Sequence, residues 1–257
     1  MNTIQTLILS IVEGITEFLP VSSTGHLILA ADIMKVAQTS FVKDFEIVIQ
    51  LGAILAIVVL YANNLFRSVE VWKRVIAAFI PTGIIGFLLF KIIKTYLLGN
   101  LYITVASLFI GGIALIILEY VYKEKEHHVA DIEKLSYKNA VLIGLFQAIA
   151  VIPGVSRSAA TIIGAMFLGT KRKAAAEFSF LLAVPTMLAA TSLDIVKSHF
   201  SYSAGEWGLM LLGFIGSFIV ALFVVKWFLK YIQTHTFIPF GVYRIILALL
   251  FYFIVIK

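Results

Sequence analysis

Long apolar runs dominate the chain, and their length restricts the folds that it can adopt. A helix needs about 20 apolar residues to cross a hydrocarbon core of about 30 Å. Six segments reach or approach that length: Phe45–Tyr61, Val75–Tyr96, Leu101–Tyr122, Ala174–Ile195, Trp207–Tyr231 and Phe240–Ile256. Strands of a membrane barrel would be shorter and would alternate in polarity, and these runs do not. We therefore expect an all-α integral membrane protein with six spanning helices, in a single polytopic domain over residues 1–257.

The composition agrees with a membrane protein. Hydrophobic residues make up 61% of the chain and charged residues 13%, and the mean hydropathy is +1.03. A soluble domain of this kind would expose large apolar patches. The net charge of +6 does not indicate nucleic-acid binding, because the basic residues are spread over the connections between apolar runs, as membrane topology requires. The absence of cysteine excludes disulfides and thiolate metal sites.

Two apolar regions are interrupted by turn-forming residues. Thr3–Lys35 is broken at Pro20–Gly25, and Tyr137–Leu168 is broken at Pro153–Ser158. Proline ends the preceding helix, and glycine and serine let the backbone turn. Each region is long enough for two half-helices with a polar tip, so we expect two re-entrant helical hairpins. The first run carries two glutamates and no basic residues before them, so we expect no cleavable signal peptide.

The basic residues give an orientation if both hairpins return to their own side. Six then lie on one side: Lys35, Lys43, Lys91, Lys94, Lys197 and Lys257. Twelve lie on the other side: Arg67, Lys73, Arg74, Lys123, Lys125, Lys134, Lys138, Lys171, Arg172, Lys173, Lys226 and Lys230. The richer side is predicted to be cytoplasmic. The first hairpin then opens outward and the second inward.

The two halves of the chain, about 1–122 and 136–257, resemble each other. Leu19–Ser23 (LPVSS) is similar to Ile152–Ser156 (IPGVS), and Glu46 and Glu177 follow their hairpins at similar distances. Opposite hairpin directions in similar halves are typical of an inverted-topology repeat, which places its site near the membrane midplane.

Glu13 and Glu17 are the first candidate site residues. They are four residues apart, so a helix places both carboxylates on one face. Two close carboxylates repel unless a divalent cation or a shared proton relieves them, and Mg²⁺ or Ca²⁺ prefers such oxygen ligands. The alternative is that both are helix-end charges that face lipid headgroups.

The first turn also contains candidates for binding an anion, which are Ser22, Ser23, Thr24 and Gly25. A helix that begins here offers free backbone N–H groups and the positive end of its dipole. Ser23 is also a candidate nucleophile if a base lies within reach, although an ordinary helix cap explains these residues as well. His26 is a candidate general base or acid, or a histidine that is simply hydrogen-bonded.

Arg157 is the strongest single signal, because it lies at the tip of a broken apolar segment. A guanidinium there needs an anionic partner, and its geometry matches phosphate oxygens. The alternative partner is a buried carboxylate, from Glu13 or Glu17. The residues around it that can complete a phosphate-binding nest are Gly154, Ser156, Ser158 and Thr161. The polar groups that we expect to make helix-packing hydrogen bonds are Glu46, Gln50 and Glu177.

Together these residues suit a phosphate or diphosphate group, and the apolar flanks suggest that the rest of the ligand is lipid. The pattern resembles the bacitracin-resistance family of undecaprenyl-diphosphate phosphatases. The matching segments are Glu13–His26 (EGITEFLPVSSTGH), Pro153–Thr161 (PGVSRSAAT), Phe45–Gly52, Glu177–Pro185 and Phe237–Phe240. One departure is Ala159, where the family usually has glycine after Ser-Arg-Ser. The methyl group of Ala159 can tighten the turn at the second tip.

The resemblance implies hydrolysis of a C55 polyprenyl diphosphate in the bacterial inner membrane, at a site open to the outer face and dependent on a divalent cation. It implies Glu13 and Glu17 as the acidic pair, Ser23 as nucleophile, His26 as its assistant and Arg157 as the group that grips the diphosphate. The partners are then the lipid substrate and the bilayer; a homodimer is one oligomeric state to test. The main alternative is a lipid-phosphate transporter or flippase, since inverted repeats with broken helices are transporter architecture. A purely structural subunit would leave Arg157 unexplained.

Overall fold

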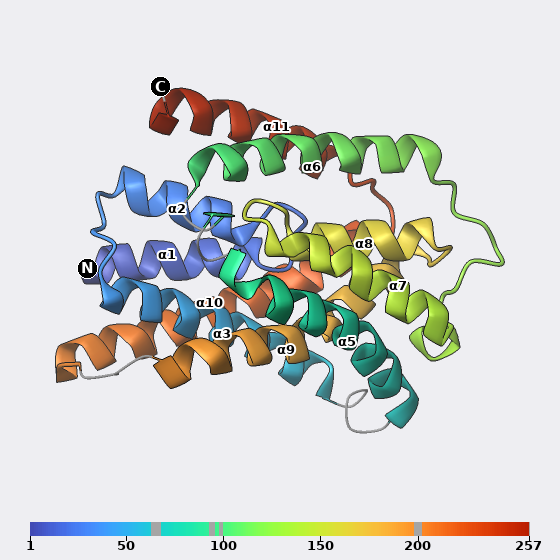
Figure 1. Cartoon of the computed structure of the whole chain (residues 1–257), viewed down its shortest axis with the longest axis horizontal. Helices are drawn as coiled ribbons and strands as arrows, with labels where there is room; N and C mark the ends of the chain where they lie inside the picture. Colours follow the sequence, from blue (N-terminus) through green and yellow to red (C-terminus); the bar gives the residue numbers. More distant parts are fainter. Residues whose placement is uncertain (63–67, 93–95, 98–99, 198–201, 257) are drawn as a thin grey trace.

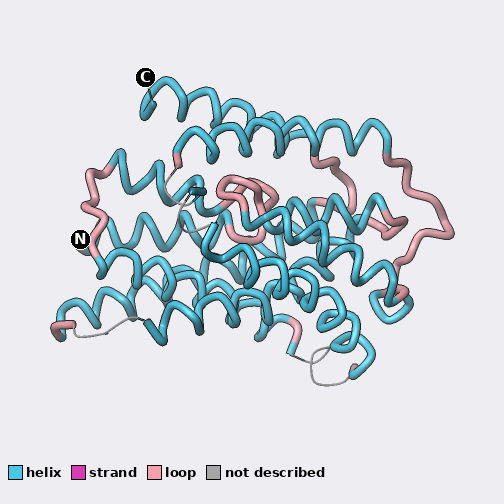
Figure 2. The backbone as a smooth tube through the Cα atoms, viewed as in Figure 1, coloured by secondary structure: helices cyan, strands magenta, loops and turns pink. Residues whose placement is uncertain are grey.

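A computed structural model of the chain describes residues 1–62, 68–92, 96–97, 100–197 and 202–256. This part of the chain consists of helices joined by loops and turns, with an isolated parallel bridge between Val129 and Thr170 (Figures 1 and 2). The α-helices are α1 Thr3–Thr16, α2 Ser23–Ile33, α3 Ser40–Leu60, α5 Val69–Ile92, α6 Leu101–Val121, α7 Tyr137–Ala148, α8 Arg157–Phe167, α9 Arg172–Lys197, α10 Ala204–Tyr231 and α11 Ile238–Phe251. The shorter turns are η2 Ile132–Lys134, η3 Ile149–Val151 and η4 Tyr252–Ile256.

Polar side chains fix where several of the helices begin. In each case an oxygen of the residue before the helix accepts a hydrogen bond from a backbone N–H of the first turn, which has no partner within the helix. These capping residues are Asn2 for α1, Thr39 for α3, Asn100 for α6, Ser136 for α7 and Ser203 for α10.

Four helices of the described part are long and apolar enough to cross a membrane: Val69–Leu89, Leu101–Val121, Arg172–Ser192 and Ala204–Tyr231. They coincide with four of the six predicted spans, as expected for an integral membrane protein. The other two predicted spans are helical, in α3 and in α11 with η4, but are not among these four. Residues 93–95 of the predicted span Val75–Tyr96 lie outside the described residues, as do Arg67, Lys94 and Lys257 of the charge count.

Both interrupted regions are broken where the sequence predicts. The first gives α1 and α2 with a turn between Thr16 and Ser23, and the second gives α7, η3 and α8 with a turn before Arg157. In Figure 1 the α1–α2 pair extends to the left and the α7–α8 pair to the right, and their turns meet in the middle.

Each broken pair packs against a long helix from the other half of the chain, α1 on α10 and α7 on α5. The second contact is close because of a glycine: a Cβ on Gly144 of α7 would lie 1.9 Å from the carbonyl oxygen of Ala78 on α5. A cluster of buried apolar side chains continues this packing up to the turns. Phe18, fully buried directly after Glu17, packs edge-on against Phe180 of α9 with ring centroids 5.3 Å apart. The core thus anchors the first turn beside α9.

Candidate active site

The first turn presents Ser23 to Glu17. Glu17 caps the end of α1, where its N–H donates to the carbonyl oxygen of Glu13 at 3.0 Å. The backbone then reverses direction at Ser22, whose φ of +73° lies in a region that residues other than glycine rarely adopt. After this reversal the Ser23 hydroxyl donates a hydrogen bond of 2.6 Å to Oε2 of Glu17. A strained backbone at such a place is typical of functional sites.

The second turn depends on a glycine. Gly154 has a φ of +88°, and a Cβ there would lie 2.3 Å from the carbonyl oxygen of Thr104 on α6. Ser156 follows and caps α8, because its side-chain oxygen accepts from the N–H of Ala159 at 3.2 Å. Arg157 is therefore the first residue of α8, at the positive end of the helix dipole.

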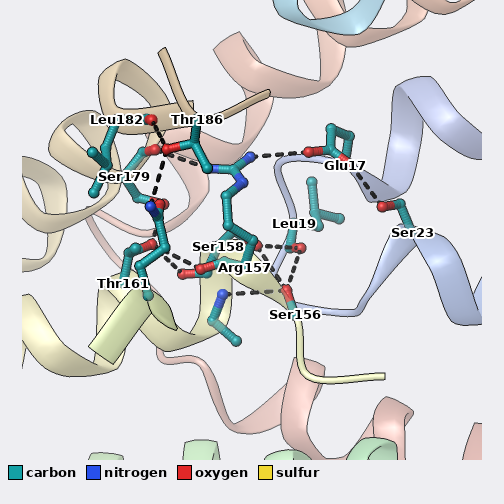
Figure 3. Close-up of polar contacts among 12 residues, drawn as sticks. Glu17, Leu19, Ser23, Ser156, Arg157, Ser158, Thr161, Ser179, Leu182 and Thr186 are labelled. Carbon is teal, nitrogen blue, oxygen red and sulfur yellow. Dashed lines mark hydrogen bonds and ion pairs between the residues drawn. The ribbon is translucent and has the colours of Figure 1, made fainter. Parts of the chain in front are cut away.

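The two turns are bonded to each other, as Figure 3 shows. The Ser158 hydroxyl donates to the carbonyl oxygen of Leu19 at 2.7 Å, and Ser156 approaches the same oxygen at 3.5 Å. Nη2 of Arg157 lies 3.1 Å from Oε1 of Glu17 in an ion pair whose side chains are only 11% and 4% exposed. One carboxylate oxygen of Glu17 thus accepts the hydrogen bond from Ser23, and the other forms the ion pair with Arg157.

Arg157 has hydrogen-bonding capacity to spare. Its Nη1 donates to the carbonyl oxygen of Ser179 on α9 at 2.9 Å, and the guanidinium lies over the ring of Phe18 at 5.7 Å. Its Nε is buried and has no partner among the described residues. Buried N–H groups without a partner are rare in folded proteins, so this atom is suited to donate to an anionic ligand.

A cavity of about 140 Å³ lies between the turns. Three of the predicted phosphate-binding residues, Ser22, Thr24 and Ser156, line it together with Ser23, Glu17 and Arg157. Its other lining residues are Gln50, Ala150, Val155 and Met187. Gln50 of α3, expected from the sequence to serve helix packing, therefore faces the site.

The other predicted phosphate-binding residues lie behind the cavity in the described structure. Gly25 is buried against Leu108 of α6, and Gly154 against α6 as described above. The side chain of Ser158 bonds Leu19, and that of Thr161 bonds the hydroxyl of Ser179 and the carbonyl oxygen of Arg157. These contacts hold the turns in place.

Glu13 is fully buried, and neither of its carboxylate oxygens has a hydrogen-bond partner among the described residues. The charged groups that act on it are Glu17, Glu46 and Arg157. A buried carboxylate beside a second one fits either a proton shared between Glu13 and Glu17 or a hard cation, which prefers oxygen ligands. The described part of the chain contains no group of three His, Asp or Glu side chains arranged to hold a metal. A cation held by Glu13 and Glu17 would need further oxygens, such as those of a phosphate.

The ring of His26 is directed toward α11. Its Nδ1 lies 2.8 Å from the carbonyl oxygen of Ser22, its Nε2 lies 2.7 Å from the hydroxyl of Tyr243, and the two rings stack with centroids 5.5 Å apart. A carbonyl oxygen only accepts hydrogen bonds, so Nδ1 carries a hydrogen, and in the neutral ring Nε2 accepts from the hydroxyl of Tyr243. Both nitrogens are therefore occupied by groups other than Ser23.

Arg244 of α11 is a residue that the sequence reasoning missed. It is fully buried, and its guanidinium donates to the carbonyl oxygens of Pro20 in the first turn and Gly154 in the second. A signal for it was present, because an arginine inside the apolar run Phe240–Ile256 is itself a hypothesis of function.

Comparisons with known proteins show to which family the chain belongs. The family model described as bacitracin resistance protein BacA matches residues 6–250. The chain is 58% identical to the undecaprenyl-diphosphatase of Aquifex aeolicus and 53% identical to that of Persephonella marina, in both cases over 98% of either chain. It is 48% identical to the undecaprenyl-diphosphatase of Methanococcus aeolicus over 97% of either chain. The chain belongs to the BacA family of bacitracin resistance proteins.

Proposed function

We propose that the protein hydrolyses undecaprenyl diphosphate to undecaprenyl phosphate and inorganic phosphate. This reaction recycles the lipid carrier for cell-wall synthesis and accounts for bacitracin resistance in the family. The observation that carries the proposal is the chain of contacts from Ser23 through Glu17 to Arg157, in which a hydroxyl, a carboxylate and a guanidinium from two turns meet at one cavity.

From these contacts we propose a role for each group. Glu17 accepts the proton as the Ser23 oxygen, or a water that Ser23 orients, attacks the terminal phosphorus. The bond between that phosphorus and the bridging oxygen breaks, and undecaprenyl phosphate leaves into the bilayer with the electron pair of that bond and the proton from Glu17. Attack by water gives inorganic phosphate directly. Attack by Ser23 gives a phosphoserine, which a second water hydrolyses: Glu17 takes a proton from this water and returns it to the Ser23 oxygen as inorganic phosphate leaves. Arg157 neutralises the diphosphate through its unpartnered Nε, and such charge stabilisation supplies most of the catalysis in phosphoryl transfer.

Glu13 and Glu17 are the residues proposed to hold a divalent cation, Mg²⁺ or Ca²⁺. When bound, the cation supplies positive charge that offsets the charge of the diphosphate. The unpartnered oxygens of Glu13 support this assignment. A cation bound there would be held from α1, whereas Arg157 belongs to α8, so the two positive charges would approach the diphosphate from different helices.

In the membrane we propose six spanning helices and two re-entrant hairpins that form an inverted-topology repeat, with halves 1–122 and 136–257. The order of helix lengths supports this. The short helices α1 and α2, with 14 and 11 residues, are followed by α3, α5 and α6 with 21, 24 and 21. The short helices α7 and α8, with 12 and 11 residues, are followed by α9 and α10 with 26 and 28, and by α11, which has 14 and continues into η4. The protein is proposed to lie in the bacterial inner membrane, as a monomer or a homodimer, with its site open to the outer face.

The test is phosphate release by protein purified in detergent, with undecaprenyl diphosphate as substrate. Loss of one donor to the transition state costs about 10²–10³-fold in kcat, so we expect at least that loss for Ser23→Ala and Arg157→Ala. Ser192→Ala is the matched control, because the Ser192 hydroxyl bonds the carbonyl oxygen of Leu188 on its own helix. Near-normal turnover in both site variants would remove the catalytic core of the proposal.

The same assay separates the phosphatase from a transporter. Detergent micelles have no gradient, so a protein that only moves the lipid would release no phosphate. Wild-type protein that releases none with any divalent cation would favour the transporter.

A further inference from the structure

Arg244 lies behind both turns and is held entirely by backbone oxygens. Its Nη1 donates to Pro20 at 3.2 Å, and its Nη2 donates to Gly154 at 3.0 Å. Nη2 also donates to Ser107 at 3.1 Å and Nε to Leu108 at 3.2 Å, both on α6. No ion pair joins Arg244 to a carboxylate within the described residues. Burying a charge is costly unless hydrogen bonds compensate it, so these four bonds explain how the fold tolerates the guanidinium.

The two turn carbonyls occupy the same place in their turns. Pro20 lies two residues before Ser22, the N-cap of α2, and Gly154 lies two residues before Ser156, the N-cap of α8. Turn carbonyls at these places lie outside the helices, so their oxygens need a partner from another element. One guanidinium satisfies both, because its planar fork presents several donors in fixed directions.

The fold makes room for this guanidinium on α6. A Cβ on Gly111 would lie 2.2 Å from Nη2 of Arg244 and 2.7 Å from its Cζ. Close to it, a Cβ on Gly112 would lie 2.7 Å from the carbonyl oxygen of Gly241 on α11. Because Gly111 and Gly112 lack side chains, α6 and α11 pack closely, and the guanidinium of Arg244 fits between α6 and the two turns.

The catalytic groups lie a few residues along the chain from the two clamped carbonyls. Glu17 and Ser23 flank Pro20, and Arg157 follows Gly154. We propose that Arg244 is a positioning residue, which sets the separation of the two turns and so aligns Ser23, Glu17 and Arg157 without touching the substrate. This role rests on the phosphatase function proposed above.

Two variants test it from different sides. Arg244→Lys keeps the charge, but a single ammonium cannot reach all four carbonyls. Gly111→Ala keeps the arginine, but the added methyl group would clash with its guanidinium and displace it. A misplacement of about 1 Å costs about 10²-fold in rate, so we expect kcat to fall by about that factor in each variant while KM stays near its wild-type value.

Each test variant has a control with the same type of substitution at another site: Arg172→Lys for Arg244→Lys, and Gly86→Ala for Gly111→Ala. Arg172→Lys alters an arginine that is ion-paired with Glu119, and Gly86→Ala adds a methyl where no described atom lies within 4 Å. Both should keep the wild-type kcat. Thermal unfolding and size-exclusion chromatography in detergent establish that each variant is folded.

Wild-type kcat in both test variants would overturn the positioning role. A raised KM with an unchanged kcat would also overturn it, because Arg244 would then bind the diphosphate directly. Loss of the folded protein in both variants would mean that Arg244 holds the fold rather than the site. Inactive wild-type protein would instead refute the phosphatase function, so the two failures are distinguishable.

Discussion

The hydroxyl of Ser23 donates to Oε2 of Glu17 at 2.6 Å, although the two residues lie on different helices separated by a turn. The contact is part of a longer chain, because Oε1 of the same carboxylate pairs with Arg157. A hydroxyl within hydrogen-bond reach of a base, with a third group that orients the base, is the arrangement typical of an activated nucleophile. Glu17 therefore connects the two turns through the two oxygens of its carboxylate.

Glu17→Gln should abolish most of the activity. The amide keeps the shape but cannot take a proton from Ser23, and general-base catalysis contributes about 10²–10⁴-fold. We expect a fall of that size in kcat, measured as phosphate release from undecaprenyl diphosphate. Glu177→Gln is the control, since Glu177 lines a different pocket beside Asp131 and Glu133. Equal activities for the two variants would show that another group takes the proton.

Glu13→Gln should change the dependence on the cation. The variant loses one negative oxygen from the proposed site, and defects in metal sites commonly cost about 10–100-fold in affinity. After treatment with a chelator, the cation concentration that restores half of the activity should rise by at least about tenfold. An unchanged titration with Mg²⁺ and Ca²⁺ would mean that Glu13 stays protonated in the site and binds no metal.

Periodicity and chain breaks in the sequence predict much of this arrangement. Proline and the small residues after it indicate both turns, and the cost of a charge in an apolar segment indicates Glu17 and Arg157. The meeting of the two turns, expected from the inverted-repeat interpretation, is confirmed by the ion pair between these residues.

Tertiary contacts decide the rest, and spacing along one chain does not reveal them. From the sequence His26 is either a general base or acid, or a histidine that is simply hydrogen-bonded. The structure shows the second arrangement, with the ring against Tyr243, more than two hundred residues along the chain. Ser158 and Thr161 look like ligands for phosphate in the sequence, yet their hydroxyls bond Leu19 and Ser179. Only the packing of α8 on α9 and on the first turn determines this.

The position of His26 predicts a smaller loss of activity on its substitution than on substitution of Glu17. Because both of its nitrogens are occupied, we expect His26→Ala to lower kcat less than Glu17→Gln does. Tyr243→Phe removes only the hydroxyl that donates to Nε2 of His26, so the two changes should have similar and non-additive effects. A loss in His26→Ala as large as in Glu17→Gln, with Tyr243→Phe unaffected, would show that the ring turns to the site during the reaction.

The direction in which the site opens can be tested by labelling, because the chain has no cysteine. Thr24 is exposed and lines the cavity, so a membrane-impermeant maleimide should modify Thr24→Cys in intact cells. Glu126→Cys, in an exposed connection on the side with more basic residues, should react only after the membrane is opened. The reverse pattern would place the cavity on the cytoplasmic side.

The crossing of α5 and α7 sets the position of the second hairpin, and Gly144 makes it possible. A Cβ at this residue would lie 1.9 Å from the carbonyl oxygen of Ala78 and 2.7 Å from the ring of Pro81. Backbone cannot move aside easily, and overpacking of this kind costs about 1–3 kcal/mol. We expect Gly144→Ala to lower the Tm in detergent.

Gly208→Ala is the matched control for that change, since no described atom lies within 4 Å of its added methyl. Replacing glycine within a helix at an open position stabilises a protein by about 0.4–1 kcal/mol, so its Tm should stay level or rise. Because α7 leads into the turn that carries Arg157, Gly144→Ala should also reduce kcat below the temperature at which it unfolds. A lower Tm with full activity would show that the other contacts of the second turn hold it in place independently of α7.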